Sequence, residues 1–217
     1  MKKIYILLFS LFSFSISAQK IKAIGIDLGG NIFPLITKYQ GFTSGIVIQG
    51  LSNQGKQWEY IIGYANLQRP NNKMGGGGNS SIDGKFTQKS EGFYGSIGQK
   101  FKKNWGWHGT LSVYNLTTNL FITDYDFNTS YQYNFPSESV ISAGGDFFLE
   151  IPTKISDKVD ANIRFSISLS IGTGTTNANQ VLYAPGLNQL TPKIWLPSFG
   201  FGISIPLMLN LNSTSNE

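Results

Sequence analysis

The segment IRFSISLSIG, residues 163–172, constrains the fold most strongly because it alternates without a break. Its odd positions, from Ile163 to Ile171, are large and apolar, whereas the even positions between them are Arg164 and three serines. A period of two is that of an extended strand with two different faces. In a soluble protein the apolar face is buried in a core, whereas in a strand that crosses a membrane it faces lipid.

Seven other segments alternate in a similar way and are separated by clusters of Gly, Asn, Pro and Ser, which favour turns. The eight expected strands cover residues 20–30, 37–51, 57–67, 86–101, 105–122, 139–151, 163–172 and 198–209. After the N-terminal segment the chain has no apolar stretch of about 18 residues, so no membrane-spanning helix is expected. The sequence therefore predicts an all-β chain.

The N-terminal residues 1–18 have the layout of a secretory signal peptide. Lys2 and Lys3 precede an apolar run from Ile4 to Phe14, and small residues follow up to Ala18. This run is too short for a membrane anchor, which needs about 20 apolar residues. We therefore expect cleavage after Ala18.

The composition favours a membrane protein over a soluble one. Charged residues make up 13% of the chain, about half of the ~25% that is typical of soluble domains. Aromatic residues make up 14%, and lipid-exposed strands exclude charge and carry aromatic residues at both interfaces. The positive charges form no basic stripe, so nucleic acid is not an expected partner.

Cofactor chemistry is not expected from this sequence. The chain has no cysteine and a single histidine. Disulfides, thiolate metal sites and histidine-rich metal sites are therefore excluded. We predict no metal ligands and no cofactors.

The connections between the expected strands are sorted by length. LSNQGK, KKN and PTKISDK follow the second, fourth and sixth strands, whereas residues 68–85, 123–138 and 173–192 form long connections after the third, fifth and seventh. GGNIFPL, after the first strand, is the exception. Short turns on one side and long loops on the other are typical of outer-membrane barrels.

These features together resemble the small eight-stranded outer-membrane β-barrel proteins of Gram-negative bacteria. The resemblance implies an eight-stranded antiparallel up-and-down transmembrane β-barrel over residues 19–209, with a polar C-terminal tail over 210–217. It also implies a monomer in the cell outer membrane, surrounded by outer-membrane lipid.

The last strand, from Trp195 to Leu209, resembles the C-terminal strand that the barrel-assembly machinery recognises in this family. It differs in two ways: the chain continues after it, and Pro206 lacks a donor for the strand ladder.

Charged residues are expected inside the barrel. Asp146 and Glu150 lie on the polar face of the sixth strand, and Arg164 lies on that of the seventh. The hairpin between these strands places Arg164 opposite Asp146 or Glu150, depending on the register. Since a buried carboxylate needs a partner and eight strands leave no wide channel, we predict an ion pair in a filled lumen.

Three tryptophans lie beside short turns. Trp105 and Trp107 follow KKN, and Trp58 follows the turn that ends in Lys56. This position predicts an aromatic girdle at the periplasmic membrane interface. A carbohydrate-stacking platform is the alternative.

His108 is the only candidate catalytic base. It shares a face with Thr110, Ser112 and Tyr114. Outer-membrane lipid A deacylases are similar at one point, since they carry a His and a Ser two residues apart on a strand, assisted by a Glu. Here the matching residue is Thr110, and the face is predicted to be inside the barrel, whereas the active site of those enzymes opens towards lipid. We therefore expect no catalytic residues.

The long connections lack a recognisable ligand motif. Four glycines at 75–78 lack the residues of a phosphate loop and predict a flexible surface loop. Tyr125, Tyr131, Tyr133 and Phe135 offer possible contacts to a surface ligand.

The expected function is that of a non-enzymatic outer-membrane β-barrel protein with long surface loops, acting in envelope integrity, adhesion or surface interaction. The alternatives are a lipid-modifying outer-membrane hydrolase that uses His108 and a secreted soluble β-sandwich binding module.

Overall fold

The computed structural model describes residues 20–31, 40–52, 54–74, 82–101, 104–172, 183–184, 187–188 and 197–211. The predicted signal peptide, most of the third long connection and all of the tail beyond residue 211 lie outside these ranges. Among the described residues there is no helix that is long and apolar enough to cross a membrane.

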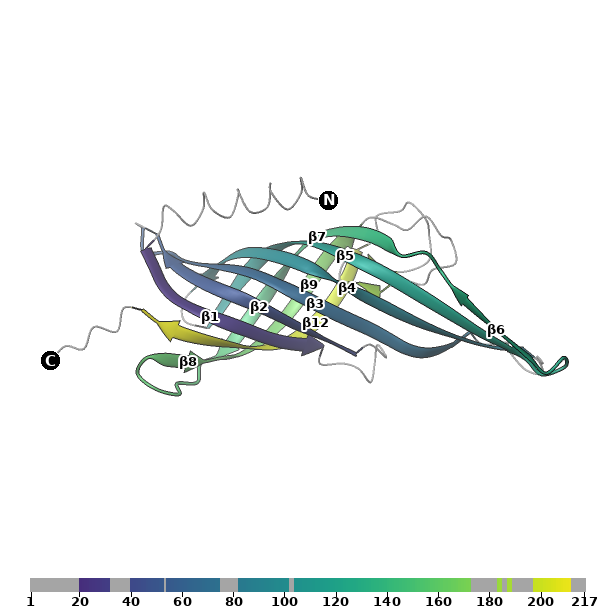
Figure 1. The fold of residues 1–217 in the computed structure, drawn as a ribbon. Helices are drawn as coiled ribbons and strands as arrows, with labels where there is room; N and C mark the ends of the chain where they lie inside the picture. The colour runs from purple at the N-terminus through teal and green to yellow at the C-terminus, as the bar shows by residue number, and fades with distance from the viewer. Residues whose placement is uncertain are drawn as a thin grey trace.

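Eight long strands form one closed ring (Figure 1). They are β1 (Lys20–Asn31), β2 (Gln40–Leu51), β3 (Gln57–Met74), β4 (Ile82–Phe101), β5 (Trp105–Asp124), β7 (Glu138–Ile151), β9 (Ile163–Gly172) and β12 (Pro197–Asn210). Ring neighbours pair antiparallel in chain order, and β1 pairs with β12. The predictions of an all-β chain and of eight antiparallel strands in up-and-down order are confirmed.

Four short strands complete the description. They are β6 (Thr129–Asn134), β8 (Val159–Ala161), β10 (Tyr183–Ala184) and β11 (Leu187–Asn188). β6 pairs with β5, β8 pairs with β12, and β10 and β11 pair with each other.

The alternation of β9 separates the two faces of the ring. Ile167 is 56% exposed, whereas Arg164 is 3% exposed. Arg164 contacts Glu59 on β3, which is not a neighbour of β9 in the ring. Such a contact is possible only across the interior, so Arg164 and the serines of β9 face inwards and its large apolar side chains face outwards.

Pro206 lies within β12 without ending it. The amide of Asn162 donates to the Pro206 carbonyl at 3.1 Å. In an antiparallel pair the N–H and C=O of one residue point to the same neighbour, so the donor that Pro206 lacks would also face Asn162. The other neighbour, Asp27 of β1, needs no bond from it. The ladder is therefore interrupted only at Asn162, between β8 and β9, and β12 continues to Asn210.

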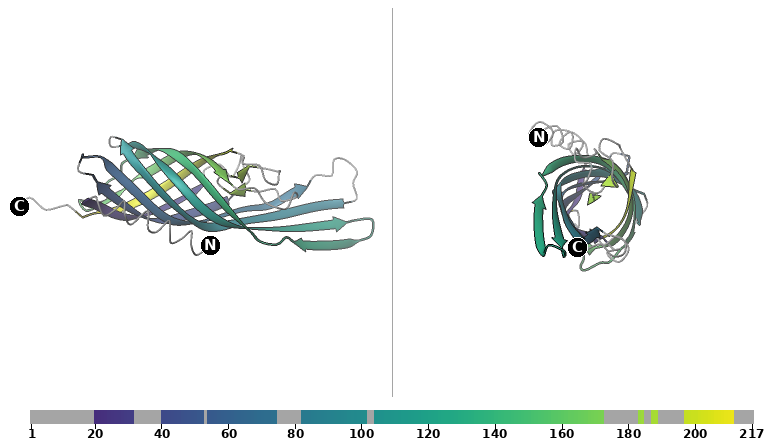
Figure 2. Two further views of the ribbon diagram at one scale, coloured as in Figure 1. Left: turned by 90° about the horizontal axis from the view of Figure 1, so that it is seen from above. Right: turned by 90° about the vertical axis from the view of Figure 1, so that its right-hand side faces the viewer.

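Two of the expected long loops are mostly strand, so that part of the prediction was wrong. β3 continues to Met74, β5 continues to Asp124, and β6 lies inside the expected second loop. We call the parts beyond the ring, residues 69–74, 82–88, 117–124 and 129–134, the arm. Figure 2 shows the arm projecting from one end of the ring. The opposite end carries the short turns and is called the short-turn end.

Two apolar clusters fill part of the interior. One contains Ala23, Val47, Ile61 and Met208, and the other contains Ala65, Tyr114, Leu116 and Val140. Tyr94 packs against both clusters. Between them and around them the interior is polar.

Candidate functional site

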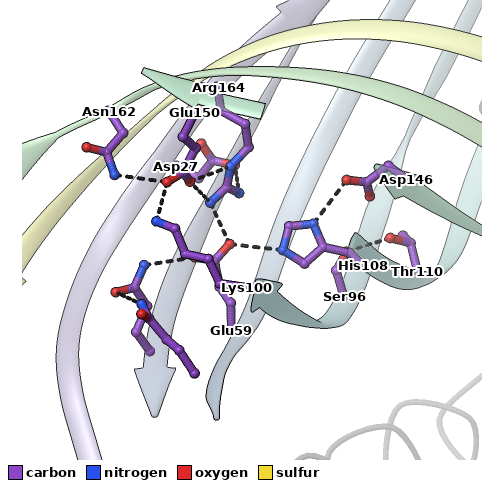
Figure 3. A network of polar contacts seen from close by, with 12 residues as sticks. Asp27, Glu59, Ser96, Lys100, His108, Thr110, Asp146, Glu150, Asn162 and Arg164 are labelled. Carbon is purple, nitrogen blue, oxygen red and sulfur yellow. Dashed lines mark hydrogen bonds and ion pairs between the residues drawn. The ribbon is translucent and has the colours of Figure 1, made fainter. Parts of the chain in front are cut away.

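Seven charged or titratable side chains converge inside the ring (Figure 3). They come from six different strands, and we call them the lumenal network: Asp27, Glu59, Lys100, His108, Asp146, Glu150 and Arg164. Because each lies on the inward face of its strand, the alternation of the strands is what brings them together.

Arg164 links three strands. Its Nε and Nη2 donate to Glu150 Oε1 at 2.9 and 2.5 Å, and its Nη2 lies 2.6 Å from Glu59 Oε1. The guanidinium also lies over the ring of Phe148, 4.5 Å from its centroid. With both ion pairs and this stacking contact, the buried cation of β9 is held by β7 and β3.

Glu150 is the acceptor at the centre of the lumenal network. Besides Arg164 it accepts from Lys100 Nζ and from Asn162 Nδ2, the latter at 3.1 Å. The hairpin register places Glu150 directly opposite Arg164. Of the two partners that the sequence left open, Glu150 is therefore the one that pairs with Arg164.

Asp146 pairs with His108 instead. His108 Nδ1 lies 3.0 Å from Asp146 Oδ2, and His108 Nε2 lies 3.0 Å from Glu59 Oε1. Ionised carboxylates only accept hydrogen bonds, so both ring nitrogens donate and His108 is an imidazolium. Its ring stacks on Phe148 with centroids 4.6 Å apart.

Gly98 leaves the space that this imidazole occupies. A Cβ at Gly98 would clash with the side chain of His108 and with the carbonyl of Trp107. A glycine is therefore required on β4 opposite His108.

The hydroxyl beside His108 is not bonded to it. Thr110 Oγ1 lies 2.7 Å from Ser96 Oγ, and both imidazole nitrogens of His108 face carboxylates. The geometry of a nucleophile activated by a histidine is thus not formed at His108. Within the described ranges no group of His, Asp and Glu is arranged to hold a metal ion.

A cavity of about 200 Å³ lies beside the lumenal network. Asp27, His108, Asp146 and Arg164 line it, together with serine, threonine and glycine residues of β5, β7, β9 and β12. Glu59 and Glu150 are almost fully buried on the side of the short-turn end. The cavity is therefore separated from that end by the ion pairs.

Within the lumenal network, Asp27 is the carboxylate with an unpaired buried oxygen. It is 7% exposed, its Oδ1 has no hydrogen-bond partner, and its Oδ2 lies 3.9 Å from Arg164 Nη1. Such a group is unusual because buried polar atoms are normally paired.

The three predicted girdle tryptophans lie beside the short turns. Trp58 and Trp107 are in edge contact, with ring centroids 6.5 Å apart, and both flank Gln99 in the register of β3, β4 and β5. Trp105 packs on Phe101 with centroids 4.8 Å apart. The structure thus gathers them on two strands either side of β4.

Sequence reasoning missed Asp27, Glu59 and Lys100. Asp27 lies between Ile26 and Leu28, and Glu59 lies between Trp58 and Tyr60. That contrast was the available signal for these two, whereas Lys100 lies on a strand with several other charges. Their meeting with Arg164 and His108 depends on how the ring closes, which the pattern of a single strand does not contain.

No protein-family model matches this chain, and no curated protein matches it in sequence.

Proposed function

We propose that this chain is a non-enzymatic transmembrane β-barrel of a Gram-negative outer membrane, which acts as a monomer and uses its arm for adhesion or surface interaction. The single observation that carries this proposal is the inverted distribution of side chains. Large apolar residues such as Ile46, Phe147 and Ile167 are at least 56% exposed on the outside, whereas charged residues such as Glu59 are buried inside. A water-soluble protein has the opposite distribution.

The register of four strands supports a membrane band with two edges. Near the short turns one row of paired residues runs across β3, β4, β5 and β7: Trp58, Gln99, Trp107 and Phe147. Towards the arm a second row runs across the same strands: Asn66, Glu91, Asn115 and Ser139. The second row marks where apolar residues give way to polar ones, whereas beyond the first row exposed apolar side chains continue at Leu149 and Ile151. The two rows therefore bound a minimum height for the band.

Between the rows every outward position is uncharged. These positions are Tyr60, Ile62, Tyr64, Phe93, Gly95, Ile97, Gly109, Leu111, Val113, Ile141, Ala143 and Gly145. The rows are eight residues apart on each strand, for example from Trp58 to Asn66. At ~3.3 Å per residue and a tilt of ~40° this gives a band roughly 20 Å high, close to the ~25 Å of outer-membrane barrels.

The arm supports surface interaction through β6, which pairs only with β5 among the strands that the structure describes. The β6 edge, TSYQYN, has no charge and no proline, and Tyr131 and Tyr133 are 60% and 56% exposed. An extended segment of a partner would add to β6 through main-chain hydrogen bonds.

The geometry at His108 favours a non-enzymatic role over a lipid-modifying hydrolase. A base must reach the proton that it removes, and both nitrogens of His108 are bound to Glu59 and Asp146 in the interior. A nucleophilic hydroxyl would have to displace one of these carboxylates.

Single cysteines test both the location and the orientation, because the chain has none of its own. Ser130→Cys places a thiol on the exposed β6 strand, and Ser156→Cys places one in the exposed turn between β7 and β8. In intact Gram-negative cells, a membrane-impermeant maleimide is expected to label residue 130 only. Both cysteines should react after the cells are lysed.

Two results would contradict the proposal. Recovery of the protein in the soluble fraction without detergent would exclude membrane insertion. Labelling of residue 156 but not residue 130 in intact cells would reverse the orientation and exclude a surface role for the arm.

A further inference from the structure

We propose that the interior cavity binds a small hydroxylated primary ammonium compound, with Asp27 as the counter-ion. The site lies inside the ring and does not depend on the surface role of the arm. It rests on the charge balance of the lumenal network, the unpaired oxygen of Asp27 and the hydroxyl groups of the cavity wall.

The charges of the lumenal network do not balance. Its four carboxylates face three cations, since Lys100, Arg164 and the imidazolium of His108 carry one positive charge each. Those cations are already in contact with Glu59, Asp146 and Glu150. The remaining negative charge belongs to Asp27.

Asp27 lines the cavity and has one oxygen without a partner. The side chain is more than nine-tenths buried, and the oxygen without a hydrogen-bond partner is Oδ1. The Nη1 atom of Arg164 lies 3.9 Å from Oδ2 of Asp27, and the same guanidinium is already paired with Glu59 and Glu150. A buried carboxylate with a free acceptor is stabilised by a ligand that brings both a positive charge and N–H donors.

The other residues of the cavity wall indicate the chemistry and the size of the rest of the ligand. Hydroxyl groups of Thr43, Ser112, Ser166, Ser168 and Ser204 are among those that line the cavity. Apolar side chains, among them Ile61 and Leu67, line the rest of the cavity. Because each hydroxyl both donates and accepts, the wall suits a ligand that has hydroxyl groups on an aliphatic body. One water needs roughly 10–15 Å³ of such volume, so the cavity has room for a molecule of several heavy atoms.

Serinol (2-amino-1,3-propanediol) and glycerol are the matched probes. They differ only in the central group, which is an ammonium in serinol and a hydroxyl in glycerol. Calorimetric titration of the folded full-length protein in detergent micelles, in phosphate buffer, is expected to show one serinol bound per chain. Glycerol should bind at least about tenfold more weakly, because the contact to Asp27 is charge-assisted.

Two variants test separately the charge of Asp27 and the free volume of the cavity. Asp27→Asn is expected to weaken serinol binding about tenfold or more, whereas Asp126→Asn, in the exposed turn of the arm, makes the same change of charge and should leave it unaltered. Ser168→Leu fills the cavity without changing any charge and should abolish binding. It keeps the proposal testable if Asp27→Asn does not fold.

Four outcomes would overturn the proposal. They are absence of serinol binding, equal affinity for serinol and glycerol, unchanged affinity in Asp27→Asn or Ser168→Leu, and displacement of serinol by equimolar KCl. Equal affinity for serinol and glycerol would mean that Asp27 carries no charge. Displacement of serinol by KCl would mean that the site binds an alkali cation instead.

Discussion

Glu150 shows how much a single residue contributes to the interior of this ring. Its carboxylate accepts hydrogen bonds from Arg164, Lys100 and Asn162, which belong to two further ring strands and to the link between β8 and β9. Burial makes these interactions hard to replace, because water does not reach either cation. Losing Glu150 removes the carboxylate that Lys100 contacts, whereas Arg164 keeps its contact to Glu59. The effect is therefore dominated by the positive charge of Lys100.

Glu150→Gln is expected to lower the free energy of unfolding by about 3–5 kcal/mol, because removing one partner of a buried ion pair leaves an uncompensated charge. The measurement is urea unfolding of the protein refolded in detergent. Asp157→Asn is the control, since Asp157 pairs with Lys154 in an exposed turn. It should cause no measurable change, and an equal loss of stability in both variants would refute this account.

The residues of the lumenal network differ in how far sequence predicts them. Arg164 and Glu150 lie on strands joined by a short turn, so a strand pattern and a hairpin suffice to bring them together. Glu59 and Arg164 are on strands that are not neighbours, and their contact depends on the stagger of all the strands between them. That stagger is set by ring closure and leaves no periodic signal in either strand.

At the scale of the element, β5 combines three environments along one strand. Its inward face changes from the ion pair of His108 to the cavity wall at Ser112 and then to the apolar cluster at Leu116. Its outward face changes from Trp107 through Leu111 to Asn115, which accepts a hydrogen bond from Ser139. If the membrane band is placed correctly, a charge on the outward face costs more at Leu111 than at Asn115.

Leu111→Arg is expected to destabilise the protein in lipid bilayers by about 2–4 kcal/mol, whereas Asn115→Arg should cost about 0–1 kcal/mol. Both side chains lie on the same face of β5, so the variants differ mainly in depth. Equilibrium unfolding in phospholipid vesicles measures both values. Similar values for the two variants would argue against a lipid-facing band between the two rows.

The arm explains why the ends of the strands were harder to predict than their middle parts. Inside the ring one face of each strand is apolar, and alternation follows. In the arm both faces are outside the band, so residues 69–74 and 82–85 lack a regular apolar face and were predicted as a loop. Main-chain pairing continues there because β3, β4, β5 and β6 supply one another with partners.

At the scale of the whole molecule, the interior is closed on one side and hollow in the middle. Glu59, Glu150 and Arg164 are almost inaccessible to water between the short-turn end and the cavity. The apolar side chains of Ala23, Val47 and Met208 add to this closure. The ring therefore encloses a chamber in preference to a continuous pore.

The closed interior predicts that the protein conducts ions poorly. In planar lipid bilayers we expect a single-channel conductance far below that of wide porins, because the buried ion pairs separate the chamber from the short-turn end. The comparison uses purified protein and a porin under the same salt conditions. Conductance in the range of the porin would contradict the closure by the lumenal network.

The link from Glu59 through Arg164 to Glu150 also bears on how the ring assembles. Glu59 belongs to the third ring strand, whereas Glu150 and Arg164 belong to the sixth and seventh, so the contact between Arg164 and Glu59 can form only when the sheet has closed. A slip of any one strand by a single residue would turn its charged side chain towards the outside. A slip by two residues would keep the charged side chain inside the ring but would move it by ~7 Å. Its partner would then be buried without an ion pair. The buried charges thus discriminate against misaligned sheets that the alternating apolar pattern alone would accept.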